Sequence, residues 1–264
     1  MRENNLFSKM AELYERGKPF AQVIIIRAQG STPRKTGTKM VITEDETFGS
    51  LGGGIVEAEI VSVAREALKK RESTLYRRAL RDDQKEDGMI CGGEMDVYID
   101  VVRPKARLLI FGGGYVGREV AKLALNLGFN VLLFDDRDLR EDLPDGIKFV
   151  RGDMVEAVEF IDFGKEDYIL ITTRSHHLDQ KILSKVIRFD VSYIGMVASK
   201  RKWKTIRDNL ISEGFSENAL NKVRAPVGLE IGAETPEEIA VSVLAEIIAC
   251  RKGVLRFGKD QGSR

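Results

Sequence analysis

The chain has 264 residues, and its 42 lysine and arginine residues nearly balance its 41 aspartate and glutamate residues, leaving a formal net charge of +1. A charge this close to zero creates no long-range attraction for nucleic acid or for an anionic membrane, so we expect neither as a partner. Hydrophobic residues make up 43% of the chain, which is typical of a globular protein and excludes wholesale disorder.

The first hundred residues predict a small α+β domain. A helix is expected near the start, where four apolar residues recur at helical spacing: Phe7, Met10, Leu13 and Tyr14. A glycine-rich loop over residues 48–54 leads into a second predicted helix over residues 55–70. Short apolar or alternating runs predict strands at residues 21–27, 39–43, 75–80 and 94–102.

After Arg103 and Pro104 the pattern changes to regularly alternating strands and helices. Strands are expected at residues 107–111, 130–134, 147–150, 168–172 and 191–195, and helices at residues 115–127 and 178–189. These strands are apolar throughout, which indicates a parallel sheet that is covered on both faces. A final helix is expected after Thr235, with Pro236 in its first turn and Glu238 completing a capping box.

The predicted fold class is therefore α/β with two domains. An N-terminal α+β domain is expected over residues 1–103, followed by a Rossmann-like, doubly wound parallel-sheet domain over residues 104–264.

The second domain carries a dinucleotide-binding fingerprint. Gly112, Gly114 and Gly117 form the pattern G-x-G-x-x-G between a predicted strand and a predicted helix, and Asp135 ends the next strand. In this context the glycines bring a pyrophosphate to the helix N-terminus, and the acid binds a ribose hydroxyl, which favours NAD over NADP. Arg137 weakens that preference, so NAD(H) and NADP(H) both stay open. The alternative is a domain that keeps the glycine turn for packing and binds no nucleotide.

Three loops of the first domain could form a second binding surface. They are the loops Gly30–Arg34, Gly52–Gly54 and Cys91–Gly93, which together offer backbone amides, hydroxyl groups, one guanidinium and one thiol. Successive amides in glycine turns form concavities that bind anions, and a guanidinium can grip a phosphate with two hydrogen bonds. Any one of these loops alone would be an ordinary tight turn, but three in one small domain favour a shared ligand cleft. Glu57, just after the triple glycine, is explained by its favourable place near a helix N-terminus.

The chain has two cysteines, Cys91 and Cys250, which is too few for a disulfide framework or a four-cysteine zinc site. We expect both thiols to be reduced and the protein to be cytoplasmic. The first residues lack the apolar core of a signal peptide, and no apolar run approaches the roughly 18 residues that span a membrane.

At this level of detail the sequence resembles the XdhC/CoxF family. The resemblance rests on an ordered series of segments: GSTPRKTGTKM, GSLGGGIVEAEI, ICGGEMDVYI, TRSHHLDQKIL, YIGMVASKRKWKTIRDNL and APVGLEIGAETPEEIAVSVLAEIIACR. Members of that family are maturation factors for xanthine dehydrogenase, carbon monoxide dehydrogenase and related molybdenum hydroxylases. The resemblance implies a chaperone that binds molybdenum cofactor, protects it during sulfuration by a cysteine desulfurase and helps to insert it into the client apoenzyme.

Under this resemblance, ten residues are candidates for a molybdenum-cofactor cleft: Ser31, Arg34, Gly52, Gly53, Gly54, Cys91, Gly92, Gly93, His176 and His177. Cys91 is a candidate soft ligand or sulfur relay, with a buried structural cysteine as the alternative. Cys250 is expected in the core of the last helix. Two positions depart from the family pattern: Ile55 stands where many relatives have cysteine, and Ala198-Ser199 where relatives have Gly-Ser. The first departure weakens the case for a two-thiol site, and no metal-ligand set is assigned.

Two other functions compete with the chaperone. The fingerprint also suits an NAD(P)-dependent oxidoreductase, but hydride transfer needs an acid or base beside the nicotinamide, and only His176 or His177 is an obvious candidate. A nucleotide-sensing binding module is the third alternative and is compatible with the first. The sequence thus favours an accessory protein over a classical enzyme, and it leaves open the client, the role of the nucleotide and whether the chain forms a homodimer.

Overall fold

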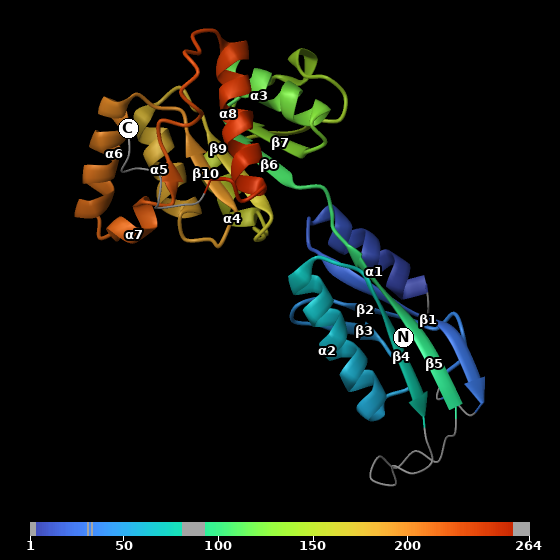
Figure 1. Cartoon of the computed structure of the whole chain (residues 1–264). Helices are drawn as coiled ribbons and strands as arrows, with labels where there is room; N and C mark the ends of the chain where they lie inside the picture. The colour runs from blue at the N-terminus through green and yellow to red at the C-terminus, as the bar shows by residue number, and fades with distance from the viewer. Residues whose placement is uncertain (1–3, 31, 33, 81–92, 256–264) are drawn as a thin grey trace. The chain divides into compact units, whose positions relative to one another are not determined.

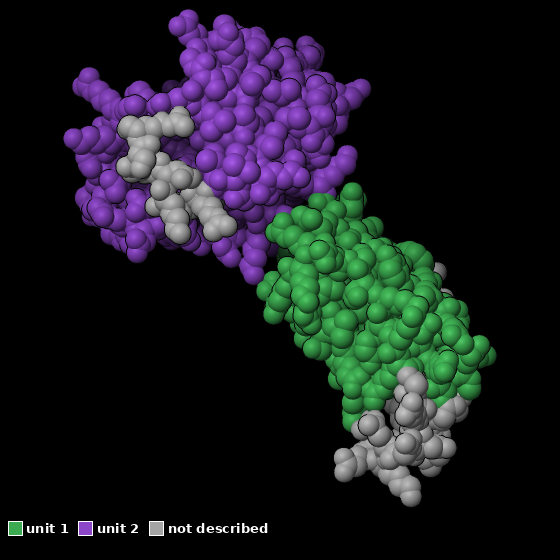
Figure 2. Space-filling view, in the orientation of Figure 1, with its two compact units in different colours: residues 1–104 green, residues 105–264 purple. Residues whose placement is uncertain are grey.

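The computed structural model describes residues 4–30, 32, 34–80 and 93–255, which separate into two compact units (Figures 1 and 2). Unit 1 comprises residues 1–104 and unit 2 comprises residues 105–264, so the boundary lies one residue from the predicted one. Each unit has its own hydrophobic core and is described by itself.

Unit 1 is an antiparallel sheet with a helix on each face. Its elements are α1 (Asn4–Glu15), β1 (Phe20–Gly30), β2 (Lys39–Ile42), β3 (Thr47–Gly49), α2 (Gly54–Lys70), β4 (Thr74–Leu80) and β5 (Gly93–Val102). The five strands lie in the order β3-β2-β1-β5-β4, and every neighbouring pair is antiparallel. The α+β architecture expected for the first domain is confirmed.

The two faces of this sheet bury alternate residues of the same strands. Val23 and Ile25 of β1 pack with the apolar side of α2, whereas Phe20 packs with Leu6 and Leu13 of α1. The apolar stripe predicted for α1 was therefore partly wrong. Leu6 replaces Phe7 in the buried stripe, and the side chains of Phe7 and Tyr14 are exposed. Phe7 instead lies under the ammonium group of Lys39, 5.9 Å from its ring centroid.

Unit 2 is a six-stranded parallel sheet. Its strands are β6 (Arg107–Phe111), β7 (Asn130–Asp135), β8 (Lys148–Arg151), β9 (Asp167–Ile171), β10 (Tyr193–Met196) and β11 (Val223–Arg224). Its helices are α3 (Tyr115–Asn126), α4 (Met154–Phe160), α5 (His176–Val186), α6 (Lys200–Ser212), α7 (Glu217–Leu220), α8 (Pro236–Arg251) and the short 3-10 helix η2 (Arg140–Asp142). The strand order is β11-β10-β9-β6-β7-β8, with every pair parallel.

This order reverses between β6 and β9, as in a Rossmann fold, and confirms the predicted doubly wound sheet. Leu108 and Ile110 of β6 face a core that includes α3 and α8, whereas Leu109 and Phe111 face a core that includes α4, α5 and α6. Both faces are therefore covered, which explains why the strands are apolar throughout.

Most predicted elements lie within about three residues of the observed ones, and the capping box of Thr235 and Glu238 is present at the start of α8. The clearest difference is α5, which begins at His176 rather than at residue 178 and ends at Val186. The short strands β3 and β11 were not predicted. No helix within the described ranges is long and apolar enough to cross a membrane.

Candidate functional site

A pocket of about 360 Å³ opens at the carboxyl ends of β6, β7 and β9. In open α/β sheets ligands bind in this crevice, at the point where the strand order reverses. The turn between β6 and α3 supplies Gly112 and Gly114, the end of β7 supplies Asp135, and the segment after β9 supplies Thr172 to Arg174. Gly112, Gly114 and Asp135 of the predicted fingerprint therefore line this pocket, whereas Gly117 does not.

The three fingerprint glycines have different local reasons to be glycine. Gly112 has a φ of +111°, and a Cβ on it would lie 2.3 Å from the carbonyl oxygen of Thr172. A Cβ on Gly117 would lie 2.0 Å from the carbonyl oxygen of Gly112, so this glycine lets α3 pack against the turn. A Cβ on Gly114 would meet no atom within 4 Å. Only Gly114 borders open space, as expected where a pyrophosphate approaches the backbone.

The backbone amides in the first turn of α3 receive no hydrogen-bond acceptor from an N-cap side chain. Gly114 is the N-cap residue and provides no side-chain hydrogen bond to the free amides of that turn. Those amides are thus free of an N-cap side chain and point their positive dipole toward the pocket. The residues of this turn therefore fit the phosphate groups of a dinucleotide.

The Asp135 carboxylate is almost fully buried and makes four hydrogen bonds within the protein. Oδ2 accepts from the Gly113 amide at 2.7 Å, and the remaining donors are the Arg137 amide, Nε and Nη2, each at 2.9 Å. Burial by itself would raise the pKa of Asp135, but the hydrogen bonds from Arg137 and Gly113 outweigh it and hold the pKa well below its usual range. A ribose hydroxyl must therefore displace Arg137 to reach this carboxylate.

The rim of the pocket is rich in arginine. Besides Arg137, it includes Arg118, which pairs with Asp142, and Arg174, which pairs with Asp136. Tyr115 is 77% exposed beside this pocket, and the Arg118 guanidinium lies 5.3 Å from its ring centroid. The rim thus offers cations for phosphate groups and an exposed aromatic face on which a base could stack.

In unit 1, the triple-glycine loop already holds an anion. The Glu57 side chain turns back so that Oε2 accepts from Ser50 Oγ at 2.7 Å, the Leu51 amide at 2.8 Å and the Gly53 amide at 2.9 Å. Burial opposes ionisation, but these hydrogen bonds outweigh it and lower the pKa of Glu57. Glu57 therefore does more than favour the helix dipole, because it organises the loop whose amides were expected to face a ligand.

The described glycines of these loops in unit 1 lie toward one end of its sheet. Gly30 at the end of β1 pairs with Gly93 at the start of β5. α2 and β4 are antiparallel neighbours, since Glu59 in the first half of α2 accepts hydrogen bonds from Tyr76 and Arg78 in the middle of β4. The N-terminus of α2, with Gly52 to Gly54, therefore lies toward the same end as Gly93. Arg34 is exposed on the segment that follows β1, whereas Ser31, Cys91 and Gly92 lie outside the described residues.

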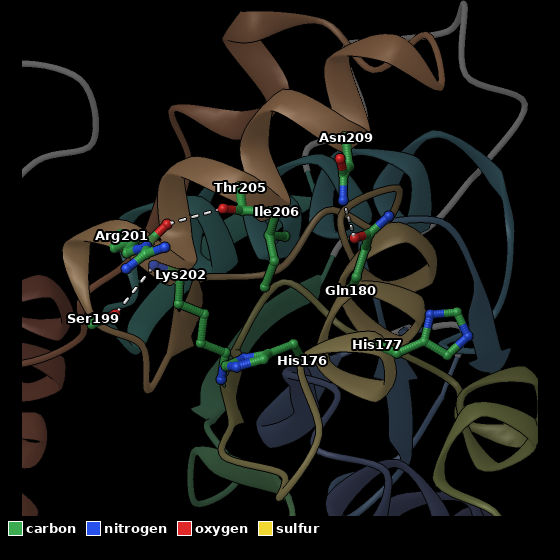
Figure 3. Close-up of a pocket in the computed structure, with 9 residues that line it drawn as sticks. All are labelled: His176, His177, Gln180, Ser199, Arg201, Lys202, Thr205, Ile206 and Asn209. Carbon is green, nitrogen blue, oxygen red and sulfur yellow. Dashed lines mark hydrogen bonds between the residues drawn. The ribbon is translucent and has the colours of Figure 1, made fainter.

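His176 and His177 lie in the first turn of α5, in unit 2. Both line a pocket of about 390 Å³ between α5 and α6. Figure 3 shows Lys202 extending from α6 toward His176, while His177 points away from Lys202. The two histidines therefore do not converge, and no cluster of His, Cys, Asp and Glu in the described part of the chain could hold a metal ion.

A buried ion pair lies beneath this region. Asp179 of α5 is fully buried and pairs with the Lys202 ammonium, which also donates to the Val197 carbonyl at 3.2 Å. The other oxygen of Asp179 accepts from the Thr173 amide at 3.0 Å and from its hydroxyl at 2.6 Å. One carboxylate thus connects the segments that follow β9 and β10. An ion pair between Asp179 and Lys202 was not predicted from the sequence.

Family comparisons agree with this two-unit architecture. A model of the XdhC Rossmann domain matches residues 108–247, more than half of the chain, and a model of the XdhC and CoxI family matches residues 13–78. The chain belongs to the XdhC family. The family resemblance predicted from the ordered sequence motifs is thereby confirmed.

Two curated relatives of this XdhC family member are matched over about half of their own length. The uncharacterized protein YqeB of Escherichia coli (strain K12) is 35% identical over 249 residues, which are 92% of this chain and 46% of that protein. A probable xanthine dehydrogenase subunit from Bacillus subtilis (strain 168) is 32% identical over 162 residues, which are 60% of this chain and 47% of that protein. The chain thus spans about half the length of these two relatives.

Two further comparisons extend over nearly the whole chain. The molybdenum cofactor insertion chaperone PaoD of Escherichia coli (strain K12) is 21% identical over 286 residues, covering 89% of this chain and 84% of PaoD. A crystal structure described as a xanthine dehydrogenase from Bacillus halodurans aligns with a TM-score of 0.52 at 20% identity, covering 100% of this chain and 98% of that one. The structural match shows that the two chains share a fold.

Proposed function

We propose that this XdhC family protein is an accessory protein that binds molybdenum cofactor and assists its sulfuration and its insertion into a molybdenum hydroxylase of the xanthine dehydrogenase type. The observation that carries the proposal is the alignment with PaoD, a molybdenum cofactor insertion chaperone, because it runs through both units and covers most of both proteins. The client apoenzyme and a cysteine desulfurase would be its protein partners.

The proposed place for the cofactor in unit 1 is the sheet end that carries Arg34, Gly93 and the triple-glycine loop. Amide-rich turns suit the anionic phosphate of the cofactor, and Arg34 is exposed there. Because Glu57 occupies the amides of Leu51 and Gly53, an incoming anion must either displace its carboxylate or use the other groups of this sheet end. Cys91 is the proposed sulfur ligand or relay.

Reconstitution of a client enzyme tests the chaperone function. An apo molybdenum hydroxylase is mixed with free molybdenum cofactor, with and without this protein, and the recovery of hydroxylase activity is followed. We expect faster or more complete recovery when the protein is present. Equal recovery in both mixtures would refute the proposal, and turnover of NADH with a small carbonyl substrate would favour the oxidoreductase instead.

The two cysteines provide a matched test of sulfur handling. Cys250 is half-buried in α8, and burial raises the pKa of its thiol, which keeps it protonated and unreactive. We therefore expect Cys91→Ala to weaken cofactor retention or sulfur loading, while Cys250→Ala leaves both unchanged. Unchanged retention and sulfuration in the Cys91→Ala protein would remove Cys91 from the mechanism.

We further propose that unit 2 binds a dinucleotide, NAD(H) or NADP(H), in the pocket beside Gly114. The open space at Gly114 and the arginine-rich rim support this, since a bound dinucleotide would place its pyrophosphate at the start of α3. The two carboxylates that line the pocket, Asp135 and Asp136, are both paired with arginine.

Calorimetric titration with NAD(H) and NADP(H) tests the nucleotide site. Gly114→Val is expected to abolish binding, because its side chain would fill the space into which the pyrophosphate must fit. Gly164→Val is the matched control, since Gly164 also has no atom within 4 Å of its Cβ position but lies outside the pocket. Absence of binding heat from the unaltered protein with every dinucleotide would leave only a structural Rossmann unit.

A further inference from the structure

The pocket between α5 and α6 is distinct from the nucleotide pocket. It has a volume of about 390 Å³, and the two pockets share no lining residue. The segment that joins β9 to α5 separates them, since Thr173 and Arg174 line one pocket and His176 and His177 line the other. Its volume lies in the range of about 300–1,000 Å³ that is typical of small-molecule sites.

The groups around this pocket are cationic or neutral. Arg201 and Lys202 line it together with the two histidines and Ser199, and no aspartate or glutamate is among the lining residues. Two carboxylates bind residues of the pocket wall, since Asp179 pairs with Lys202 and Glu213 accepts a hydrogen bond from Gln180. A negatively charged ligand therefore meets no competing anion on the pocket wall.

Arg201 is the cation best placed to receive a ligand. Its side chain is exposed at the pocket, and it forms no ion pair with any described residue. Lys202, in contrast, is fixed by Asp179 and by the Val197 carbonyl, so it provides a positioned but partly neutralised charge. A guanidinium that is free to form two parallel hydrogen bonds matches the geometry of a phosphate or a carboxylate.

Both helices begin at this pocket and are tied together farther along. α5 starts at His176 and α6 starts at Lys200, so the positive ends of two helix dipoles lie beside the cationic side chains. Asn209 of α6 donates to Gln180 of α5 at 3.0 Å, and both residues line the pocket (Figure 3). The pocket thus extends from the start of the two helices to the hydrogen bond between Asn209 and Gln180.

From this arrangement we propose that the pocket between α5 and α6 binds the phosphate group of a small phosphorylated molecule, with Arg201 and His176 as its principal side-chain contacts. The phosphate is expected near the start of the two helices, and the remaining volume accommodates a short organic group. The inference stands apart from the proposed chaperone function, because phosphate binding is measured on this protein alone.

Calorimetric titration of the full chain with inorganic phosphate and with glycerol 3-phosphate, in a phosphate-free buffer of low ionic strength, tests the proposal. We expect saturable binding of both probes and an affinity about tenfold lower for Arg201→Ala, since a charge-assisted hydrogen bond contributes about this factor. Lys204→Ala is the matched control, because it removes the same charge from the same helix at an exposed residue that does not line the pocket. Its affinity is expected to change less than twofold.

The variants also separate this pocket from the nucleotide site. Gly114→Val is expected to leave phosphate binding intact, while His176→Ala weakens it. Loss of phosphate binding in Gly114→Val would assign the phosphate to the nucleotide pocket and overturn the proposal. Equal weakening by Arg201→Ala and Lys204→Ala would overturn it too, because binding would then reflect only the general charge of α6. Absence of saturable binding to the unaltered protein would do the same.

Discussion

Replacing Asp135 by asparagine tests whether the end of β7 is held together by this buried carboxylate. Each of its oxygens accepts two hydrogen bonds, from Gly113 and from three nitrogen atoms of Arg137. An asparagine side chain retains one acceptor oxygen and places an NH₂ donor against two of these donors. At least two hydrogen bonds to a charged group are therefore lost, including one or more from a backbone amide.

The expected loss of stability is about 2–4 kcal/mol, since a hydrogen bond to a charged group contributes about 1.5–3 kcal/mol and the half-exposed Arg137 side chain can recover water. The measurement is urea unfolding at neutral pH followed by the fluorescence of Trp203, the chain's only tryptophan, which packs against a core of unit 2. With a urea dependence of about 2 kcal/mol per molar, the midpoint should fall by roughly 1–2 M.

Asp138 provides a matched control for this substitution. Its carboxylate binds the amide and the guanidinium of Arg140 at the same two-residue spacing, but both side chains are well exposed. The Arg140 hydrogen bonds lower the pKa of Asp138 to about 2, yet water screens the pair. We expect no resolvable midpoint shift for Asp138→Asn. Equal shifts in the two variants would refute the argument that burial makes the Asp135 contacts strong.

The pH dependence gives a second check on Asp135. Because the pKa of Asp135 is lowered in the folded protein, its contribution is complete above the unfolded pKa near 4 and is lost as the pH falls below that value. The difference in stability between the unaltered protein and Asp135→Asn should therefore be constant from about pH 6 to pH 8 and shrink below about pH 4. A difference that grows on acidification would contradict this reasoning.

Three further predictions follow from close contacts in unit 2. Gly117→Ala places a Cβ 2.0 Å from the Gly112 carbonyl oxygen. We expect the free energy of unfolding to fall by about 3 kcal/mol and the Tm measured by calorimetry to fall by about 6–12 °C. An unchanged Tm would show that α3 can shift freely. Arg137→Ala exposes the Asp135 carboxylate to a ribose hydroxyl, so the preference for NAD over NADP, measured as the ratio of their Kd values, should rise about tenfold. An unchanged ratio would argue against ribose binding by Asp135. Asp179→Asn leaves the Lys202 ammonium without its counter-ion, and we expect a loss of about 3 kcal/mol in the free energy of unfolding. The measurement is denaturant unfolding followed by circular dichroism, and adding Lys202→Met should recover part of the loss. Strictly additive losses in the double variant would disprove the coupling.

Much of the fold of unit 2 could be predicted because its sequence signals are local. Residues 108–111 are apolar on every position, which is typical of a strand buried on both faces. The capping box of Thr235 and Glu238 is complete within four residues, and it marks the start of α8 correctly. The glycine fingerprint combines spacing with its strand and helix context, so the turn between β6 and α3 was also predictable.

The contacts that the sequence did not predict depend on longer distances or on particular backbone geometry. The choice between Leu6 and Phe7 for the buried side of α1 depends on where Phe20 and Val41 lie in the sheet. The Glu57 contacts require the positive φ of +79° at Gly53, which folds the loop back onto the helix. Asp179 and Lys202 are 23 residues apart and meet only because β9 and β10 are neighbours.

The chain passes between its two units only once, through the few residues that separate β5 from β6. Among the described strands, each sheet is built only from strands of its own unit, and each unit buries apolar residues in cores of its own. Each sheet, with the hydrophobic cores beside it, is therefore encoded by one continuous stretch of the sequence on its own side of this junction. In evolutionary terms, a single crossover in the gene at this junction would pass on all the described strands of either sheet together.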